Sequence, residues 1–202
     1  MPQPPSPFLG LQHIGLKVHD IEAALDFYVG KLGFTITEIH PPGRVPGVDF
    51  GLAFLRCTAL HHDVSLFFWR RWECPAPEVN TMQRPGPGMH HIALQVASRR
   101  ELEAWERHLT RLGVEIVWAR AIHSPTHPEG DGLWGENHAF YISDPSGNCI
   151  EIFCDMALFD PARNEVYSGW FRDRLTRDGH DPNSASPPKP WKEDYSFLEE
   201  KR

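Results

Sequence analysis

The stretch LQHIGLKVHDIEAALDFYVGKLGF, residues 11–34, is matched near the middle of the chain by MHHIALQVASRRELEAWERHLTRLGV, residues 89–114. In each, a histidine precedes a short run of alternating apolar residues, a helical pattern follows, and a Leu-Gly pair comes near the end. Alternation with a period of two predicts a strand, and apolar spacings of three and four predict a helix. The chain therefore contains two copies of one strand–helix unit.

The two predicted strands place a histidine on a small, polar face. Side chains alternate between the two faces of a strand, so the apolar residues of each copy share one face and can pack on the helices. His13 and His91 fall on the opposite face, at the same step of their strands. Such a face suits the lining of a cup better than a core.

Both predicted helices carry start and stop signals. Asp20 is the expected N-cap of the first helix, and Ser98 with Glu101 has capping-box spacing at the start of the second. Gly33 and Gly113 stand where helices commonly end in the left-handed conformation.

Three strand-like runs follow each helix, so each half is predicted to be a βαβββ module. The runs are FTITEIH, DFGLAFLRC and DVSLFFW in the first half, and VEIVWA, HAFYIS and CIEIFC in the second. One module alone has an open edge and an uncovered face, so we expect two to pair. The expected α+β domain covers residues 8–155, with module 1 at about 8–72 and module 2 at about 86–155. A Pro-rich tail, residues 156–202, is expected to be partly docked or disordered.

Composition excludes several classes of protein. The formal net charge is −7 and no basic stripe offsets it, which argues against a nucleic-acid partner. No apolar run has membrane-spanning length, and the N-terminal segment lacks the pattern of a signal peptide. The four cysteines form no CxxC pair, which favours reduced thiols and a cytoplasmic location.

A third polar group joins the two histidines. In CIEIF, Ile150 and Ile152 are expected to face the helices, so Glu151 faces the cup. An inward carboxylate is costly unless a positive group meets it. Two imidazoles and one carboxylate, here His13, His91 and Glu151, form the donor set typical of non-haem Fe(II), with Mn(II) as the alternative. A hydrogen-bonded His–Glu network without metal is the competing interpretation.

The repeat also predicts a fourth wall position. Setting DVSLFF against NCIEIF places Ser65 where the second half has Glu151. Serine is a poor ligand for a divalent ion, so a metal held here would keep open positions for substrate.

These features resemble the vicinal oxygen chelate superfamily, whose members build paired βαβββ modules around a divalent metal. The resemblance covers roughly residues 8 to 155 and implies a half-open mixed β-barrel with its helices outside. Glyoxalases, epimerases, fosfomycin-modifying enzymes, bleomycin-binding proteins and extradiol catechol dioxygenases share this scaffold, so the fold alone does not fix the function.

Local motifs are closest to those of the extradiol dioxygenases. FYISDPSGNCIEIF resembles their signature, and the resemblance implies that Tyr141 hydrogen-bonds a substrate oxygen. LHHDVSLF resembles the segment in which His62 would be the second-sphere acid–base. A further substrate-side histidine of the family would fall at Gly132 here; the loop HSPTHPEGDGLWGENH offers three histidines instead, of which His127 is the favoured one and His123 and His138 are the others.

The expected protein is thus an Fe(II)-dependent extradiol dioxygenase acting on a small aromatic diol with O₂. The resemblance also implies a homo-oligomer, a dimer or higher. Two alternatives stay open: a metal-dependent isomerase, epimerase or lyase on the same scaffold, and a metal-free small-molecule binding protein. The empty fourth corner at Ser65 speaks against the first, and the set of His13, His91 and Glu151 speaks against the second.

Overall fold

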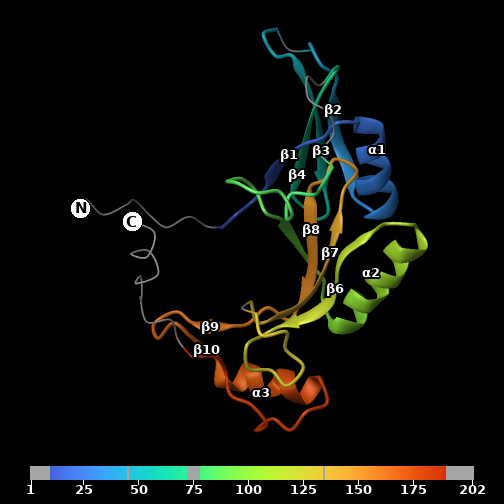
Figure 1. Ribbon diagram of the computed structural model, residues 1–202. Coiled ribbons are helices and arrows are strands. Elements are labelled where there is room, and N and C mark those ends of the chain that lie inside the picture. The colour runs from blue at the N-terminus through green and yellow to red at the C-terminus, as the bar shows by residue number, and fades with distance from the viewer. Residues whose placement is uncertain (1–9, 45, 72–77, 134, 190–202) are drawn as a thin grey trace, which may run out of the picture. The chain divides into compact units, whose positions relative to one another are not determined.

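The computed structural model describes residues 10–44, 46–71, 78–133 and 135–189 (Figure 1). Contacts divide the chain into two compact units. The first comprises residues 1–91 with 143–149, and the second comprises residues 92–142 with 150–202.

The first unit contains a four-stranded mixed sheet with the order β1-β4-β3-β2, in which β1 runs parallel to β4 and the other pairs are antiparallel. A helical segment, α1 continued by the π-helical η1, connects β1 to β2 (Figure 1). The elements are β1 (Ile14–Lys17), α1 (Ile21–Leu25), η1 (Asp26–Lys31), β2 (Thr35–His40), β3 (Phe50–Arg56) and β4 (Val64–Trp69).

The first helix departs from the single α-helix that its apolar stripe predicts. Asp20 caps its start as expected, accepting hydrogen bonds from two backbone N–H groups. Beyond Leu25 the turns widen, and the Leu32 N–H donates to the Phe27 carbonyl at 3.0 Å. A wider turn rotates each residue by a smaller angle, which lets the consecutive Phe27 and Tyr28 both be buried.

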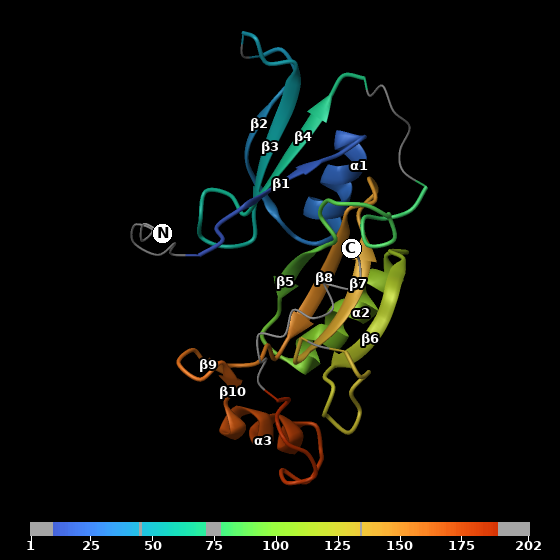
Figure 2. The same ribbon diagram turned by 60° about the vertical axis from the view of Figure 1, so that its left-hand side comes forward.

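The second unit repeats this plan with the sheet order β5-β8-β7-β6. The α2 helix lies over one face of this sheet (Figures 1 and 2). Ser98 caps the helix as predicted, and Leu102 and Leu109 of the helix are buried. The elements are β5 (Ile92–Gln95), α2 (Arg99–Arg111), β6 (Ile116–His123), β7 (Asn137–Ser143) and β8 (Cys149–Cys154).

The two sheets share one strand register as well as one strand order. In the parallel pair β1–β4, Gly15 stands beside Ser65, and in the pair β5–β8, Ala93 stands beside Glu151. The predicted βαβββ repeat and the α+β class are therefore confirmed, and neither described sheet closes into a barrel by itself.

The tail contains structure that the sequence analysis did not predict. A short hairpin of β9 (Phe159–Asp160) and β10 (Glu165–Val166) leads into α3 (Ser168–Arg177) (Figure 2). Phe171 and Leu175, four residues apart on α3, are fully buried. Charged residues between them weaken the apolar signal, which is why the pattern of this helix is hard to read. The end of the predicted tail, residues 190–202, lies outside the described residues.

None of the helices in the described part of the chain is both long and apolar enough to cross a membrane.

Candidate functional site

The strand register places the predicted wall positions in equivalent places of the two sheets. Ile14 pairs with Val64, and Ile92 pairs with Ile150. One residue farther along β4 and β8, Ser65 and Glu151 thus occupy the same position, as the alignment of the two halves predicts. Both side chains are buried.

The first unit brings His13 and His62 together. Their ring centroids are 4.5 Å apart, and His62 also lies 4.4 Å from the ring of Phe54. The Nδ1 atoms of His61 and His62 are 2.9 Å apart. Desolvation, together with the neighbouring His13 and His61, lowers the pKa of His62 below its ordinary value. A lowered pKa keeps this imidazole neutral near pH 7, where it can accept a proton.

Asp63 fixes the segment that carries His62. Its carboxylate accepts hydrogen bonds from the backbone N–H groups of Cys57 and Thr58, at 2.7 and 2.9 Å, and from the Thr58 hydroxyl. Asp63 therefore closes the turn between β3 and β4 and orients the histidine before it.

The remaining two candidate ligands also have near neighbours. The Nδ1 atoms of His90 and His91 are 2.7 Å apart. Glu151 is buried, and its Oε1 accepts a hydrogen bond from the Asn137 amide at 2.8 Å. A residue such as Asn137 that holds a carboxylate in one orientation resembles the supporting partners found behind metal ligands.

Two imidazoles and a carboxylate suit a divalent first-row metal by their chemistry. His13 and His91 belong to the first unit and Glu151 to the second. Among the residues that the structure describes, no group of three His, Cys, Asp or Glu side chains is gathered within one metal-binding arrangement. The assignment of these three ligands stays a prediction.

In the second unit, Tyr141 is part of a chain of three side chains. The Tyr141 hydroxyl lies 3.1 Å from His123 Nε2, and His123 Nδ1 lies 2.6 Å from Asp131 Oδ2. Trp118 stacks on the Tyr141 ring with centroids 5.5 Å apart. The direction of the His123–Tyr141 hydrogen bond depends on the tautomer of His123: Nε2 accepts from the phenol when it carries no hydrogen, and donates to the phenol oxygen when it carries one.

The loop between β6 and β7 folds back on β6 to make this contact. The Asp131 N–H donates to the Ile122 carbonyl at 2.9 Å, and the Gly132 N–H donates to the Ser124 carbonyl at 3.2 Å. At Gly130, a Cβ atom would stand 2.2 Å from the Ser124 carbonyl oxygen. Only glycine therefore permits this close approach.

The structure places His127 in a different group of side chains. His127 Nε2 and His138 Nε2 lie 3.2 and 3.1 Å from Asp178 Oδ2, just beyond the C-terminal end of α3. Burial, and then the charge of Arg174, lower the pKa of His127. Among the three loop histidines, His123 contacts Tyr141, whereas His127 and His138 face the tail.

Arg174 of α3 is buried beside the same loop. Its Nη1 lies 2.9 Å from Glu136 Oε2, and its Nη2 donates to the Asn137 carbonyl at 3.4 Å. The other oxygen of Glu136 accepts from the Ser124 hydroxyl at 2.8 Å. Burial raises the pKa of Glu136, although the hydrogen bond from Ser124 and the charge of Arg174 oppose that shift.

Sequence reasoning missed Asn137, Asp131 and Arg174. Asn137 is the first residue of β7 and lies four residues before Tyr141, so the alternation along the strand puts both side chains on the same face. This position could have marked Asn137 as a candidate site residue. Asp131 and Arg174 reach the site through a folded loop and through a helix of the tail, and no periodicity reports such contacts.

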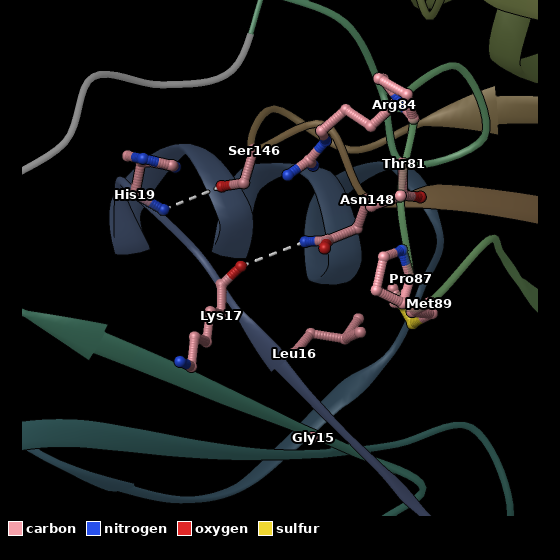
Figure 3. A pocket seen from close by; sticks show the side chains of 13 residues that line it. Gly15, Leu16, Lys17, His19, Thr81, Arg84, Pro87, Met89, Ser146 and Asn148 are labelled. Atoms are coloured by element: carbon pink, nitrogen blue, oxygen red, sulfur yellow. Dashed lines mark hydrogen bonds between the residues drawn. The ribbon is translucent and has the colours of Figure 1, made fainter.

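A pocket of about 500 Å³ lies in the first unit between β1 and the turn that joins β7 to β8 (Figure 3). The His19 N–H donates to Ser146 Oγ at 2.9 Å, and the Asn148 amide donates to the Lys17 carbonyl at 3.2 Å, which fixes this turn on β1. Arg84 also lines the pocket. None of the predicted ligands or catalytic residues lines it.

The repeated βαβββ modules, with a histidine before each first strand and the buried Glu151 on the last strand of the second module, define the class of protein. The chain belongs to the Glyoxalase/Bleomycin resistance protein/Dioxygenase superfamily, whose model matches residues 10–152. Members of this superfamily typically bind a divalent metal. The matched region ends within β8, so α3 lies beyond it.

Known proteins similar to this chain support the same placement. A 2,2',3-trihydroxybiphenyl dioxygenase of Sphingomonas paucimobilis is 26% identical over 144 residues, which are 71% of this chain and 40% of that protein. The chain thus spans about two fifths of the length of that curated relative. A glyoxalase family protein from Enterococcus faecalis matches with a TM-score of 0.52 and 20% identity, covering 72% of this chain and 98% of that one. A glyoxylase/bleomycin resistance protein/dioxygenase domain from Frankia sp. EAN1pec matches with a TM-score of 0.50 and 17% identity, covering 73% and 98%. The two structures show the fold alone.

Proposed function

We propose that the protein is a metal-dependent extradiol dioxygenase that opens the ring of a catechol-like aromatic with O₂. His13, His91 and Glu151 would hold Fe(II), with Mn(II) as the alternative. The metal, when bound, would polarise two vicinal substrate oxygens and supply the redox chemistry. The product would be a ring-opened semialdehyde or a related acid.

The single observation that carries this proposal is the Ser65–Glu151 equivalence in the strand register. In the proposed site, this equivalence would supply one carboxylate and leave the fourth corner without a protein ligand. A substrate with two vicinal oxygens needs such open positions. The similarity to a trihydroxybiphenyl dioxygenase supports the dioxygenase over other chemistries of the superfamily.

The chain's own residues would move and hold the protons. His62, with its lowered pKa, is suited to take a proton from the substrate hydroxyl and to return it later in the reaction. Tyr141 would hydrogen-bond a substrate oxygen and stabilise its negative charge. We propose His123 as the side chain that orients the Tyr141 hydroxyl, on the basis of their 3.1 Å contact. His127, the loop histidine favoured by the sequence, is the alternative for a substrate-side role.

The second candidate function is a metal-dependent isomerase, epimerase or lyase on the same scaffold. It would use the same donor set, but it would consume no oxygen. A metal-free binding protein, the third candidate, would have little use for a buried Glu151 held by Asn137.

The test is anaerobic reconstitution with Fe(II), followed by oxygen uptake and absorbance of the ring-opened product on a panel of catechols. We expect oxygen uptake matched by product for at least one catechol. Metal binding without oxygen uptake on the whole panel would favour the isomerase class, and no metal binding would favour the binding protein.

A further inference from the structure

Arg174 lies at the centre of a buried polar group that joins the tail to the second βαβββ module. Its side chain is fully buried, and it is four residues before Asp178. The guanidinium contacts Glu136 and the Asn137 carbonyl, which end the loop between β6 and β7. A planar guanidinium can make two directed hydrogen bonds at once, which a lysine ammonium cannot do in the same geometry.

One path leads from Arg174 to Glu151. The guanidinium holds the backbone of Asn137, and the side-chain amide of Asn137 donates to Glu151 Oε1 at 2.8 Å. Glu136 at the other end of the guanidinium has a positive φ of 48°, so the backbone just before Asn137 is in a conformation that needs support. Arg174 therefore holds Asn137, and Asn137 in turn holds the carboxylate of Glu151.

A second path leads from Arg174 to His123. Glu136 links the guanidinium to the Ser124 hydroxyl, through contacts of 2.9 and 2.8 Å. Ser124 directly follows His123, and its Oγ also accepts from the His127 N–H at 3.0 Å. The start of the loop is thereby held where His123 meets Tyr141.

We propose that Arg174 is a positioning residue, by which the helix α3 outside the matched family region sets the orientation of Glu151 and His123. This inference rests on the proposed function, because its test measures metal binding by His13, His91 and Glu151. A buried ion pair by itself is weak evidence for a stabilising role, since apolar residues of similar volume often serve as well. Arg174 does more than fill volume, because its Nη1 contacts the Glu136 carboxylate and its Nη2 donates to the Asn137 carbonyl.

The experiment compares Mn(II) affinity, kcat and KM in matched variants. Arg174→Met alone would leave Glu136 as a buried unpaired carboxylate, so the test variant is Arg174→Met with Glu136→Gln, in which the glutamine can still accept from Ser124. The control is Phe171→Leu, which loosens the packing of α3 through the apolar cluster that Phe171 forms with Val166 and Leu175. Both variants are assayed well below their melting temperatures.

We expect the paired variant to bind Mn(II) about 10-fold more weakly than the wild type, the lower end of the effect of removing support behind a ligand. Its kcat should fall, and Phe171→Leu should stay within about 2-fold of the wild type in both quantities. Asn137→Ala should weaken Mn(II) binding at least as much, and adding it to the paired variant should bring little further loss, because both act on one path.

Equal Mn(II) affinity and kcat in the wild type and the paired variant would overturn the positioning role, as would an equal loss in Phe171→Leu, which would make α3 a purely structural element. Additive losses for Asn137→Ala and the paired variant would also overturn it. If the wild type binds neither Mn(II) nor Fe(II), the metal set fails and the inference fails with it.

Discussion

The β1–β4 sheet and the β5–β8 sheet share strand order, strand register and a preceding histidine, yet they carry different polar residues. Ser65 of the first sheet stands where Glu151 stands in the second. The first unit carries His62 beside its histidine, and the second carries Tyr141 with His123. The repeat supplies equivalent positions, and the differences between the copies fall at the residues for which we propose a function.

The second copy is also the more heavily supported one. In the first, His62 lies in a turn held by Asp63. In the second, the loop before β7 is tied to α3 through Arg174 and Asp178. The two copies thus differ in how much of the chain outside the repeat holds their functional residues.

The first prediction concerns His62, the proposed acid–base, which lies in the first copy. We expect His62→Phe to retain metal and to lose ring cleavage by roughly 10²–10⁴-fold, the usual worth of a positioned acid–base. His61→Phe, at the neighbouring imidazole, is the control and should keep most of the activity. Oxygen uptake and absorbance of the ring-opened product are the measurements. Equal ring cleavage in wild type and His62→Phe would remove His62 from the mechanism.

A second experiment makes the two sheets alike. Ser65→Glu should supply a fourth ligand and retain metal, and turnover should fall by on the order of 100-fold because a position worth several kcal/mol of substrate polarisation is taken. Ser65→Gln is the control, because glutamine has nearly the volume of glutamate but no charge. It should not tighten metal binding. Metal affinity and kcat are measured for both. Undiminished turnover in Ser65→Glu would show that Ser65 does not face the metal.

The third prediction tests the support that only the second copy has. Burial alone would raise the pKa of Asp178, but hydrogen bonds and charges from His138 and Arg99 outweigh it and lower the pKa from 3.8 to about 2. A carboxyl with a lowered folded-state pKa stabilises the protein above about pH 4. That contribution, about 2 kcal/mol, is lost as the pH falls from about 4 to 2.

Urea unfolding of wild type and Asp178→Asn at pH 5 and at about pH 2.5 measures this difference. The gap in free energy of unfolding between the two proteins should shrink on acidification. A difference that is the same at both pH values would show that the contacts with His138 and Arg99 do not lower the pKa of Asp178.

The smallest expected effect separates the two loop histidines. His123→Phe should lower kcat by on the order of 10-fold, the equivalent of one positioned hydrogen bond of about 1.4 kcal/mol. His127→Phe should change kcat less and lower the melting temperature more, since His127 packs against Asp178. Measurements of kcat and of the melting temperature for both variants distinguish the two roles. The reverse pattern would support the sequence-based choice of His127.

Much of the fold could be predicted because it rests on local patterns. The strand alternation, the caps at Asp20 and Ser98, and the repeat all report the β1–β4 and β5–β8 modules directly. The π-helical turn after Leu25 could not be read, because its apolar spacing also fits an α-helix. The helix α3 has only Phe171 and Leu175 as a clear apolar pair.

The candidate site was predictable to the extent that it follows the repeat. The equivalence of Ser65 and Glu151 follows from aligning two strands. The choice between His123 and His127 does not, because it depends on how a loop folds back on β6. Asn137 could be placed on the strand that carries Tyr141, but its hydrogen bond to Glu151 is known only from the structure.

Metal content tests the central claim most directly, namely that the repeat assembles one metal site from His13, His91 and Glu151. Wild type, the three single Ala variants and the control His90→Ala are reconstituted with Fe(II) without oxygen, desalted and analysed for metal, with circular dichroism to check the fold. We predict about one metal per chain in the wild type and in His90→Ala, and less than about a tenth of that in each ligand variant, because a three-ligand site does not survive loss of one donor. Ligand variants that are all as metal-loaded as the wild type would contradict the claim.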